Sequence, residues 1–353
     1  MFSSATAAGR LLFSTASSSA AKGRVGIIGV GKMGAAFANN LVLAGHDVSL
    51  FDVKEENVEA AIEASSNPGK VASASSVSEL AESCSSVITM LPNDAILKRV
   101  CVEEGLIETL SSAHSSSLHI SCSTVSPHTS RELDKIHEDA SPTSKYVAAP
   151  VFARPDGLAS QQASFTMSAS CPNALREATA LMEPSNGKVF PFGEDPGAGN
   201  VAKLCGNFLI ASTIESLAES LALAEANGVD RVAVKDMLTS TIFDCLIYKG
   251  YGQRVSERDH RPGGFALDLG LKDISLVLDT AHKSNVAMPF GSVMKDNFTS
   301  AMAKGRQELD WSAMALQASE NAGVDVEGAV KASEQGIPEH LKPSSIVKSR
   351  RGK

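Results

Sequence analysis

Three polar side chains at helical spacing give the sequence its clearest chemical signal. The stretch "GNVAKLCGN", residues 199–207, carries Asn200, Lys203 and Asn207, which are three and four positions apart. This spacing puts all three on one stripe of a helix. Because the chain continues with mostly apolar residues, we expect the helix to be buried, where an amine is costly without a partner or a function. The alternative is a plain helix start, with Asn200 as the N-cap and Lys203 reaching solvent.

A dinucleotide-binding pattern lies near the start of the chain. The apolar run "VGIIGV" leads into G-x-G-x-x-G at Gly29, Gly31 and Gly34. These glycines permit a tight turn, close approach of a pyrophosphate and close helix–strand packing. Asp52 ends a second apolar run 21 positions after Gly31, where a carboxylate can accept from a ribose 2′-hydroxyl. Asp52 would repel a 2′-phosphate, so we expect NAD, although Lys54 keeps NADP open. A glycine turn without a ligand is the alternative.

Strand and helix patterns alternate through the first half of the chain. Short apolar runs separated by amphipathic segments predict a doubly wound, Rossmann-type parallel sheet. Ligands bind beyond the carboxyl ends of such strands. The stretches "MLPND" (90–94) and "SCSTVSP" (121–127) fall at two of these ends and are therefore candidate site loops. Either stretch could also be an ordinary turn, because Pro, Asn and Ser favour turns.

The second half of the chain is predicted to be all-helical. We divide the sequence into a targeting peptide (1–22), a Rossmann dinucleotide-binding domain (23–198), a helical substrate and dimerisation domain (199–325) and a C-terminal tail (326–353). The polar, glycine-rich stretch 248–266 is expected to be a loop or lid. The helical patterns cover residues 200–227, about 230–243, about 267–284, about 289–304 and about 311–321.

Composition limits the classes of function. The 353 residues carry a net charge of −8 without a basic stripe, which disfavours nucleic-acid binding. There is no run of 18 apolar residues, so we expect no membrane span. The six cysteines form no CxxC pair and no Cys/His cluster with metal-ligand spacing, so we expect no metal site. We interpret them as small buried apolar residues of a reducing compartment.

The first 22 residues have the composition of an organelle transit peptide. They are rich in Ser and Ala, include Arg10 and Lys22, and precede the first acidic residue of the chain, Asp47. The absence of a long apolar core disfavours a secretory signal. The stretch "GRLLF" favours the mitochondrial matrix, whereas the serine content keeps a plastid open. A plain disordered tail is the remaining alternative.

Four segments in the expected order resemble the β-hydroxyacid dehydrogenase family, which includes 3-hydroxyisobutyrate dehydrogenase. "IIGVGKMGAAFANNL" resembles its N-terminal signature, with Val30 where leucine is usual and Phe37 where methionine or alanine is usual. "ITMLPND" resembles its cofactor loop, and "GNVAKLCGN" its G-x-x-x-K-x-x-x-N catalytic helix. "FALDLGLKDISLVLDTA" resembles its distal Lys-Asp segment. The resemblance implies a Rossmann domain followed by a helical domain, and a homo-oligomer.

The resemblance also implies roles for individual residues. Lys203 would exchange the proton of the substrate hydroxyl as the nicotinamide takes the hydride, and Asn207 would hold the substrate. A buried ammonium suits this role because it stabilises a developing alkoxide and has a lowered pKa. Ser123 and Thr124 would contact the substrate carboxylate. The matching cofactor positions are Gly29, Val30, Gly31, Lys32, Met33, Gly34, Asp52, Met90, Leu91, Pro92, Thr124, Phe265 and Lys272.

Two departures from the family pattern bear on the substrate. Ser121 stands where the family usually has Asp, and "APVFARP" replaces the usual "APVSGG". Phe152 and Arg154 thus occupy a segment that normally cradles a small acid. We expect Arg154 either to bind the substrate carboxylate bidentately or to face solvent.

The sequence therefore predicts an NAD-dependent oxidoreductase acting on the CH–OH group of a small β-hydroxy acid or on the matching semialdehyde. The alternative is a non-catalytic NAD(P)-binding sensor or interaction module on the same fold, because fold does not fix function. Retention of Lys203, Asn207 and Lys272 favours the enzyme. A 6-phosphogluconate dehydrogenase is disfavoured because its helical half is longer than the roughly 150 residues left here.

Overall fold

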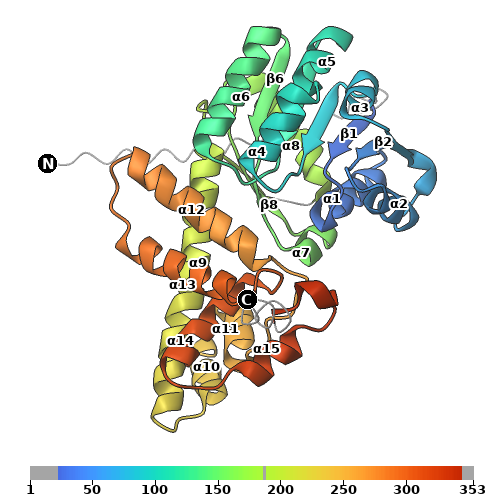
Figure 1. The fold of residues 1–353 in the computed structure, drawn as a ribbon. Helices are drawn as coiled ribbons and strands as arrows, with labels where there is room; N and C mark the ends of the chain where they lie inside the picture. Colours follow the sequence, from blue (N-terminus) through green and yellow to red (C-terminus); the bar gives the residue numbers. More distant parts are fainter. Residues whose placement is uncertain (1–22, 186–187, 344–353) are drawn as a thin grey trace, which may run out of the picture.

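The first half of the chain folds around a six-stranded parallel sheet in the order β3-β2-β1-β4-β5-β6. The fold is taken from a computed structural model that describes residues 23–185 and 188–343 (Figure 1). The central strand β1 pairs with β2 on one side and β4 on the other, so the strand order reverses there. The strands of this sheet are β1 (Val25–Ile28), β2 (Val48–Phe51), β3 (Val71–Ser73), β4 (Ser86–Thr89), β5 (Ser117–Ser121) and β6 (Ser144–Ala148).

Helices cover both faces of this sheet, as the predicted Rossmann-type fold requires. Alternate strand residues enter two separate cores: Ile27 joins one together with Phe37 of α1, and Ile28 joins the other together with Leu80 of α3. This alternation follows from the two-residue period of a strand buried on both sides. The helices of this half are α1 (Lys32–Leu43), α2 (Glu55–Glu63), α3 (Val77–Ser83), α4 (Asp94–Lys98), the π-helix η2 (Arg99–Glu103), α5 (Leu106–Ala113), α6 (Pro127–Ala140), α7 (Pro155–Ala159) and α8 (Pro172–Met182), with short 3-10 turns η1 (Pro68–Lys70) and η3 (Glu183–Ser185).

The last strands of this half form a second, three-stranded sheet. β7 (Val151–Phe152) is antiparallel to β8 (Ser164–Met167), which is parallel to β9 (Lys188–Pro191). This small sheet packs into the same core as α1, through Phe165 against Phe37. Its position leaves β7 and the loop after it facing the helical domain.

A single long helix, α9 (Ala198–Ala226), connects the two domains (Figure 1). At 1.5 Å per residue it is roughly 44 Å long. By length and composition alone α9 could cross a membrane, and half of the relevant 18-residue window is buried inside the protein. The other helices of this half are α10 (Arg231–Thr239), α11 (Leu246–Glu257), α12 (Leu267–Lys283), α13 (Pro289–Ala303), α14 (Leu316–Asn321) and α15 (Glu327–Ser333), with 3-10 turns η4 (Trp311–Ala315) and η5 (Glu339–Leu341).

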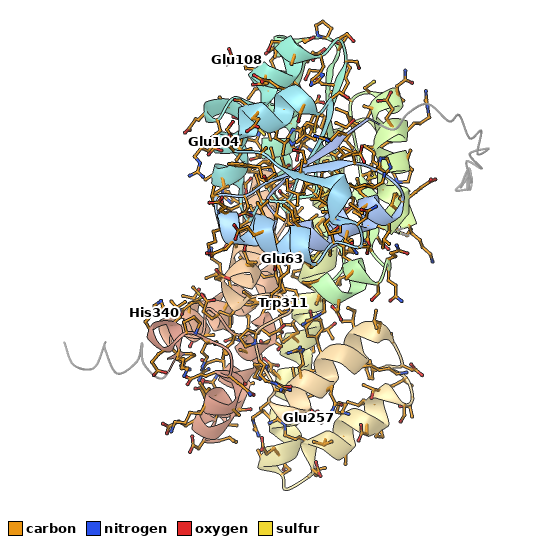
Figure 2. The ribbon with its side chains drawn as sticks, turned by 90° about the vertical axis from the view of Figure 1, so that its right-hand side faces the viewer. Glu63, Glu104, Glu108, Glu257, Trp311 and His340 are labelled. Atoms are coloured by element: carbon orange, nitrogen blue, oxygen red, sulfur yellow. The ribbon has the colours of Figure 1, made fainter. Side chains whose placement is uncertain are left out.

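The helical domain packs around a core that includes Trp311. In Figure 2, turned by 90°, Trp311 lies near the junction of the two domains, whereas Glu104 and Glu108 lie on the sheet domain and Glu257 on the helical domain. Trp311 contacts the rings of Phe265 and Phe298 and donates from Nε1 to the Tyr251 hydroxyl at 2.8 Å.

Two sequence expectations about this half are wrong in part. The stretch expected to be a loop or lid, 248–266, is non-helical only from residue 258 on, because its first part forms most of α11, where Gly252 allows close helix contact. A Cβ on Gly252 would lie 3.1 Å from Cγ of Lys235 on α10. The expected tail, 326–353, begins with α15, and Val330 and Ile337 are buried in the helical core.

Candidate active site

Lys203 is buried on the first turns of α9. The helix begins at Ala198 with Gly197 as its N-cap, so Asn200 lies inside the helix and is not a cap. Lys203 is only 8% exposed, which excludes the alternative that its amine extends into solvent. Its Nζ lies 4.0 Å from the ring centroid of Phe152, on β7. The predicted stripe of polar residues is therefore buried, since Asn200 and Asn207 are buried as well.

Burial changes the acid–base properties of this amine. Desolvation lowers the pKa of Lys203 to about 8, from 10.5, with nearby Asp273 opposing the shift and Lys272 adding to it. An amine with this pKa can both accept and donate a proton near neutral pH, which is the property that general acid–base catalysis requires.

Asp273 ties Asn207 and Lys272 into one polar cluster. Asn207 Nδ2 donates to Asp273 Oδ2, and Lys272 Nζ lies 2.7 Å from Asp273 Oδ1. The same Nζ donates to the backbone carbonyl oxygen of Thr124 at 2.7 Å. The Asp273 side chain is almost completely buried, so its charge is compensated within the protein. The cluster joins α9 and α12 of the helical domain to the loop after β5.

The loop after β4 meets the loop after β5 through Ser123. The Ser123 hydroxyl accepts from the backbone N–H of Leu91 at 2.8 Å. Asn200 fixes the same region from α9, because its Oδ1 accepts from the N–H of Val125 and its Nδ2 donates to Ser130. The two loops that the sequence singled out thus lie at one edge of the sheet, against the first turns of α9.

The glycine turn has the close contacts that its sequence predicted. Gly29 has φ +91°, and a Cβ there would lie 2.5 Å from the carbonyl oxygen of Met90. A Cβ on Gly34 would lie 2.0 Å from the carbonyl oxygen of Gly29, so α1 packs directly on the strand. Gly31 is different, since no atom lies within 4 Å of its Cβ position and no side chain caps α1 there. The first N–H groups of α1 are therefore open to a ligand.

Asp52 fixes the turn from the end of β2. Its Oδ2 accepts from the N–H of Val30 at 2.7 Å, and its Oδ1 accepts from the N–H of Lys54 and from Asn57 Nδ2. The carboxylate is therefore oriented by the chain itself beside the glycine turn.

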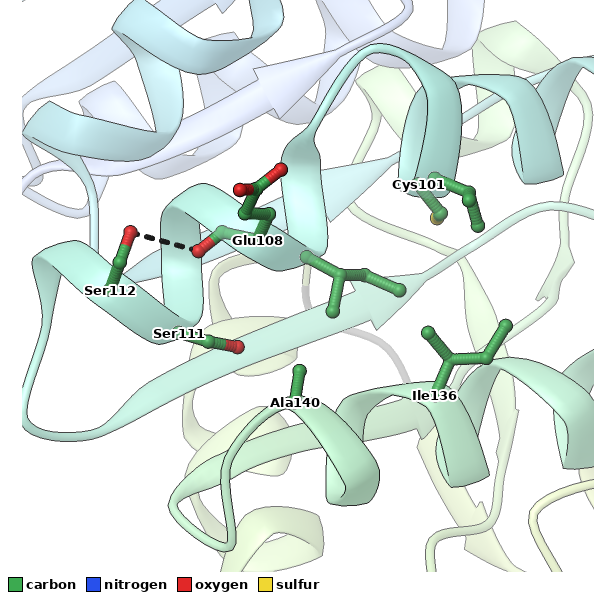
Figure 3. Close-up of a pocket in the computed structure, with 8 residues that line it drawn as sticks. Cys101, Glu108, Ser111, Ser112, Ile136 and Ala140 are labelled. Carbon is green, nitrogen blue, oxygen red and sulfur yellow. Dashed lines mark hydrogen bonds between the residues drawn. The ribbon is translucent and has the colours of Figure 1, made fainter.

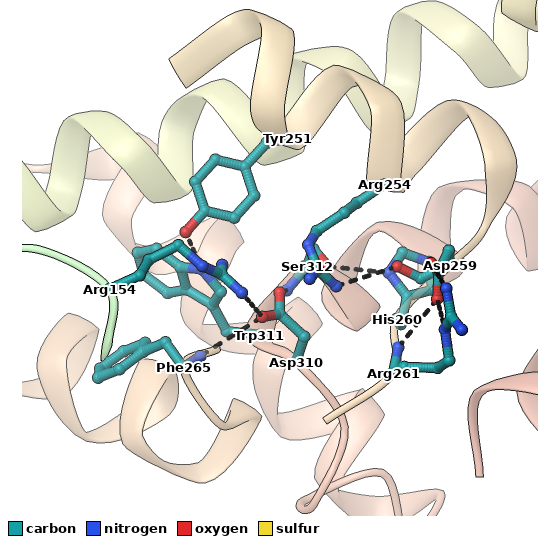
Figure 4. Close-up of polar contacts among 10 residues, drawn as sticks. All are labelled: Arg154, Tyr251, Arg254, Asp259, His260, Arg261, Phe265, Asp310, Trp311 and Ser312. Carbon is teal, nitrogen blue, oxygen red and sulfur yellow. Dashed lines mark hydrogen bonds and ion pairs between the residues drawn. The ribbon is translucent and has the colours of Figure 1, made fainter. Parts of the chain in front are cut away.

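Arg154 has a partner that neither sequence expectation included. Its Nη2 donates to Oδ2 of buried Asp310 at 3.2 Å, across the domain junction, so it is neither free in solvent nor available as an unpaired guanidinium (Figure 4). Asp310 Oδ2 also accepts from the N–H of Phe265 at 3.4 Å. The Phe265 ring packs edge-on against Trp311, 5.0 Å between centroids. Arg154 therefore forms an ion pair that bridges the two domains.

A separate hollow lies outside this cluster. The hollow, of about 480 Å³, lies between η2, α5 and α6, and none of the predicted site residues lines it (Figure 3).

Within residues 23–185 and 188–343 there is no group of three or more side chains suited to a metal. Cys84, Cys101 and Cys122 are buried as expected, but Cys205 and Cys245 are exposed, contrary to our interpretation.

Two family models together match most of the chain. Residues 24–193 match the NAD binding domain of 6-phosphogluconate dehydrogenase, and residues 197–318 match the NAD-binding region of NADP-dependent 3-hydroxyisobutyrate dehydrogenase. An uncharacterized oxidoreductase of Bacillus subtilis, YfjR, is 31% identical over 82% of this chain and 98% of its own length. The chain belongs to the β-hydroxyacid dehydrogenase family.

Characterised relatives and structures agree with this membership. The mitochondrial 3-hydroxyisobutyrate dehydrogenase of Drosophila melanogaster is 29% identical over 82% of this chain and 87% of its own. The 3-hydroxyisobutyrate dehydrogenase of Mycobacterium tuberculosis, solved with L-serine, superposes with a TM-score of 0.73 at 28% identity, covering 84% of this chain and 99% of that one. This family member is an NAD(P)-dependent hydroxyacid oxidoreductase with a Rossmann domain and a helical C-terminal domain.

The residues of the glycine turn fit a dinucleotide. The uncapped start of α1, the space at Gly31 and the carboxylate of Asp52 would hold pyrophosphate and ribose. Val30 is buried, whereas Gly31 and Lys32 are exposed at the mouth of the turn. Of the loop after β4, Met90 and Leu91 are half-buried and Pro92 is exposed. When bound, the nicotinamide supplies or accepts the hydride.

The structure brings two residues close to Lys203 whose proximity to this amine was not predicted from the sequence. Asp273 follows Lys272 directly in the chain, and its burial on the inner face of α12 could have been inferred from the apolar period around it. The contact between Phe152 and Lys203 had no signal, because it joins β7 to α9 across the domain junction.

Proposed function

We propose that this chain is an NAD-preferring dehydrogenase or reductase of a small β-hydroxy acid and its semialdehyde, with Lys203 as the general acid and base. The observation that carries the proposal is the burial of Lys203 beside the Asn207–Asp273–Lys272 cluster, at the junction with the loops that follow β4 and β5. A buried amine beside such a cluster is costly for a purely structural role.

The side chains around Lys203 have separate roles in the proposed reaction. In oxidation the neutral Lys203 amine takes the proton of the substrate hydroxyl, and in reduction the ammonium returns it to the developing alkoxide. Asn207 orients the reacting oxygen, since its bond to Asp273 fixes the amide. Ser123 and Thr124 contact the substrate carboxylate. Lys272 closes over the cofactor from α12, and its bond to the Thr124 carbonyl supports this role.

Cofactor preference depends on Asp52. Its carboxylate is held beside the turn by three donors, so it cannot easily move away from a 2′-phosphate. We therefore propose that NAD is preferred over NADP. Lys54 is exposed two residues further on and is the residue that would moderate this preference. Met33 and Phe265 would contact the cofactor from α1 and from the loop before α12.

We further propose a homo-oligomer and a mitochondrial matrix location. Large apolar side chains are exposed on the helical domain, including Leu209 and Leu223 on α9 and Leu246 on α11, and a second copy would cover them. The organelle proposal rests on the composition of residues 1–22, which lie outside the described residues, and a plastid remains the alternative address.

A substrate panel tests the function. Purified protein would be assayed by NADH absorbance with small β-hydroxy acids and NAD or NADP, and in reverse with the semialdehydes. We expect turnover of at least one short aliphatic β-hydroxy acid, with a higher kcat/KM for NAD. Tight cofactor binding without turnover of any compound in either direction would favour a non-catalytic sensor instead.

A further inference from the structure

The ring of Phe152 lies directly on α9. Its centroid is 4.0 Å from Lys203 Nζ. A Cβ on Gly206 would lie 2.4 Å from two of its ring carbons. Any residue other than glycine at position 206 would therefore collide with the ring. The ring thus occupies the surface of α9 between the amine and Gly206.

The chain holds this ring in place from both sides. Val151 and Phe152 pair with Phe165 and Ser164 in the small sheet. Two residues further on, Arg154 is fixed by its ion pair with Asp310 in the helical domain. The ring is therefore attached to a short segment with anchors in both domains, unlike a flexible loop.

The ring affects the amine in two separable ways. Its face carries negative charge density and attracts an ammonium placed over it, more strongly where water is excluded. Its bulk also covers one side of Nζ and keeps water from that side. The amine can then meet a substrate only from the sides that the ring leaves open.

We propose that Phe152 is a positioning residue for Lys203: its ring, seated on Gly206, covers one side of the ammonium and restricts the substrate to the remaining sides of the amine. The proposal rests on Lys203 as the acid–base group. The proposal explains the segment "VFARP", because the aromatic ring of Phe152 stands where the family usually has small residues. The ring acts on the Lys203 amine and not on the substrate carboxylate.

The test compares Phe152→Leu with Phe152→Tyr. Leucine keeps an apolar cover without an aromatic face, whereas tyrosine keeps the face. The pKa of Lys203 would be measured on each folded variant by acetic anhydride labelling across a pH series, followed by mass spectrometry of the peptide carrying Lys203. This readout needs no turnover, so it stands apart from the proposed function.

Phe152→Leu is expected to lower the pKa of Lys203 by about one unit, because the charged form loses the aromatic face. Phe152→Tyr is expected to leave it near its original value. The pH profile of kcat should shift in parallel in the leucine variant. An unchanged labelling midpoint in Phe152→Leu, an upward shift, or equal shifts in both variants would overturn the proposal. If these results hold but Lys203→Met retains turnover, the proposed function fails separately.

Gly206→Ala provides a second, independent variant. In a helix interior alanine normally stabilises by about 1 kcal/mol relative to glycine. Here the methyl group would displace the Phe152 ring, so we expect a lower melting temperature and the same downward shift of the labelling midpoint. A Gly206→Ala protein that melts higher and labels like the wild type would show that the ring is not seated there.

Discussion

Arg154 and Asp310 join the two domains across 156 positions of sequence, with Nη2 of the guanidinium 3.2 Å from Oδ2 of the carboxylate. The Asp310 side chain is fully buried and also accepts hydrogen bonds from the backbone N–H groups of Phe265 and Ser312. Arg154 precedes α7, which packs against α1 of the glycine turn. The pair thus links the helix that starts the cofactor site to the loop that carries Phe265.

Removing one member of this ion pair should lower the free energy of unfolding more than removing both members. Arg154→Met leaves the Asp310 carboxylate buried without its guanidinium, and we expect a loss of about 1–3 kcal/mol in the free energy of unfolding, since Arg154 is partly exposed. Adding Asp310→Asn should recover part of that loss. Urea denaturation of both single variants and the double variant measures the coupling, and strictly additive losses would show that the two groups do not interact.

The Asp52 carboxylate should set the choice between NAD and NADP. Asp52→Ser removes the charge that opposes a 2′-phosphate, and we expect the ratio of kcat/KM for NAD to that for NADP to fall at least about tenfold. Lys54→Ala is the matched control and should move the ratio the other way or leave it unchanged. A ratio unaffected by Asp52→Ser would mean that another residue discriminates between the cofactors.

Local patterns predicted the parts of the fold that depend on neighbouring residues. The turn at Gly29 and Gly34 and the stripe on α9 follow from steric contact and helix period, so their positions were correct. The glycine-rich stretch 248–266 predicts a loop because glycine suggests flexibility, whereas Gly252 of α11 serves close packing against Lys235.

Contacts between distant segments could not be predicted from such patterns. Nothing in the residues around Arg154 indicates Asp310, and nothing around Phe152 indicates Lys203. Both pairs exist because β7 leaves the main sheet and faces the helical domain. The departures from the family pattern therefore identified the right segment but not its partners.

Burial of Lys203 should reduce stability below about pH 8. Its folded pKa, about 8, is below the unfolded value of 10.5, so the unfolded chain binds more protons between these values and stability rises with pH there. We expect Lys203→Met to be more stable than the wild type at neutral pH, by about 1–3 kcal/mol. The difference should shrink as the pH approaches 10.5. A difference that is independent of pH in denaturant titrations would contradict the lowered pKa.

A buried histidine pair should make the sheet domain sensitive to acid. His119 Nδ1 lies 3.0 Å from His137 Nε2, and desolvation lowers the pKa of both, that of His137 to about 3. Their contribution is complete above the unfolded pKa of 6.5 and is lost as pH falls toward the folded values. Between pH 6.5 and about pH 5 we expect a loss of about 2 kcal/mol from His137, with a further loss from His119.

Urea unfolding at the two pH values measures this loss. His137→Gln is the control, since it removes one titrating group and should reduce the acid loss. Equal acid losses in wild type and variant would show that His137 titrates normally.

The most direct test of the whole account is the turnover of Lys203→Met with a substrate found in the panel. We expect the affinity for NADH, measured by the change in its own fluorescence on binding, to stay within a few-fold of wild type, while kcat falls by about 10²–10⁴. Near-normal kcat in a folded Lys203→Met protein would contradict the central claim, because a different group would then exchange the proton of the substrate hydroxyl.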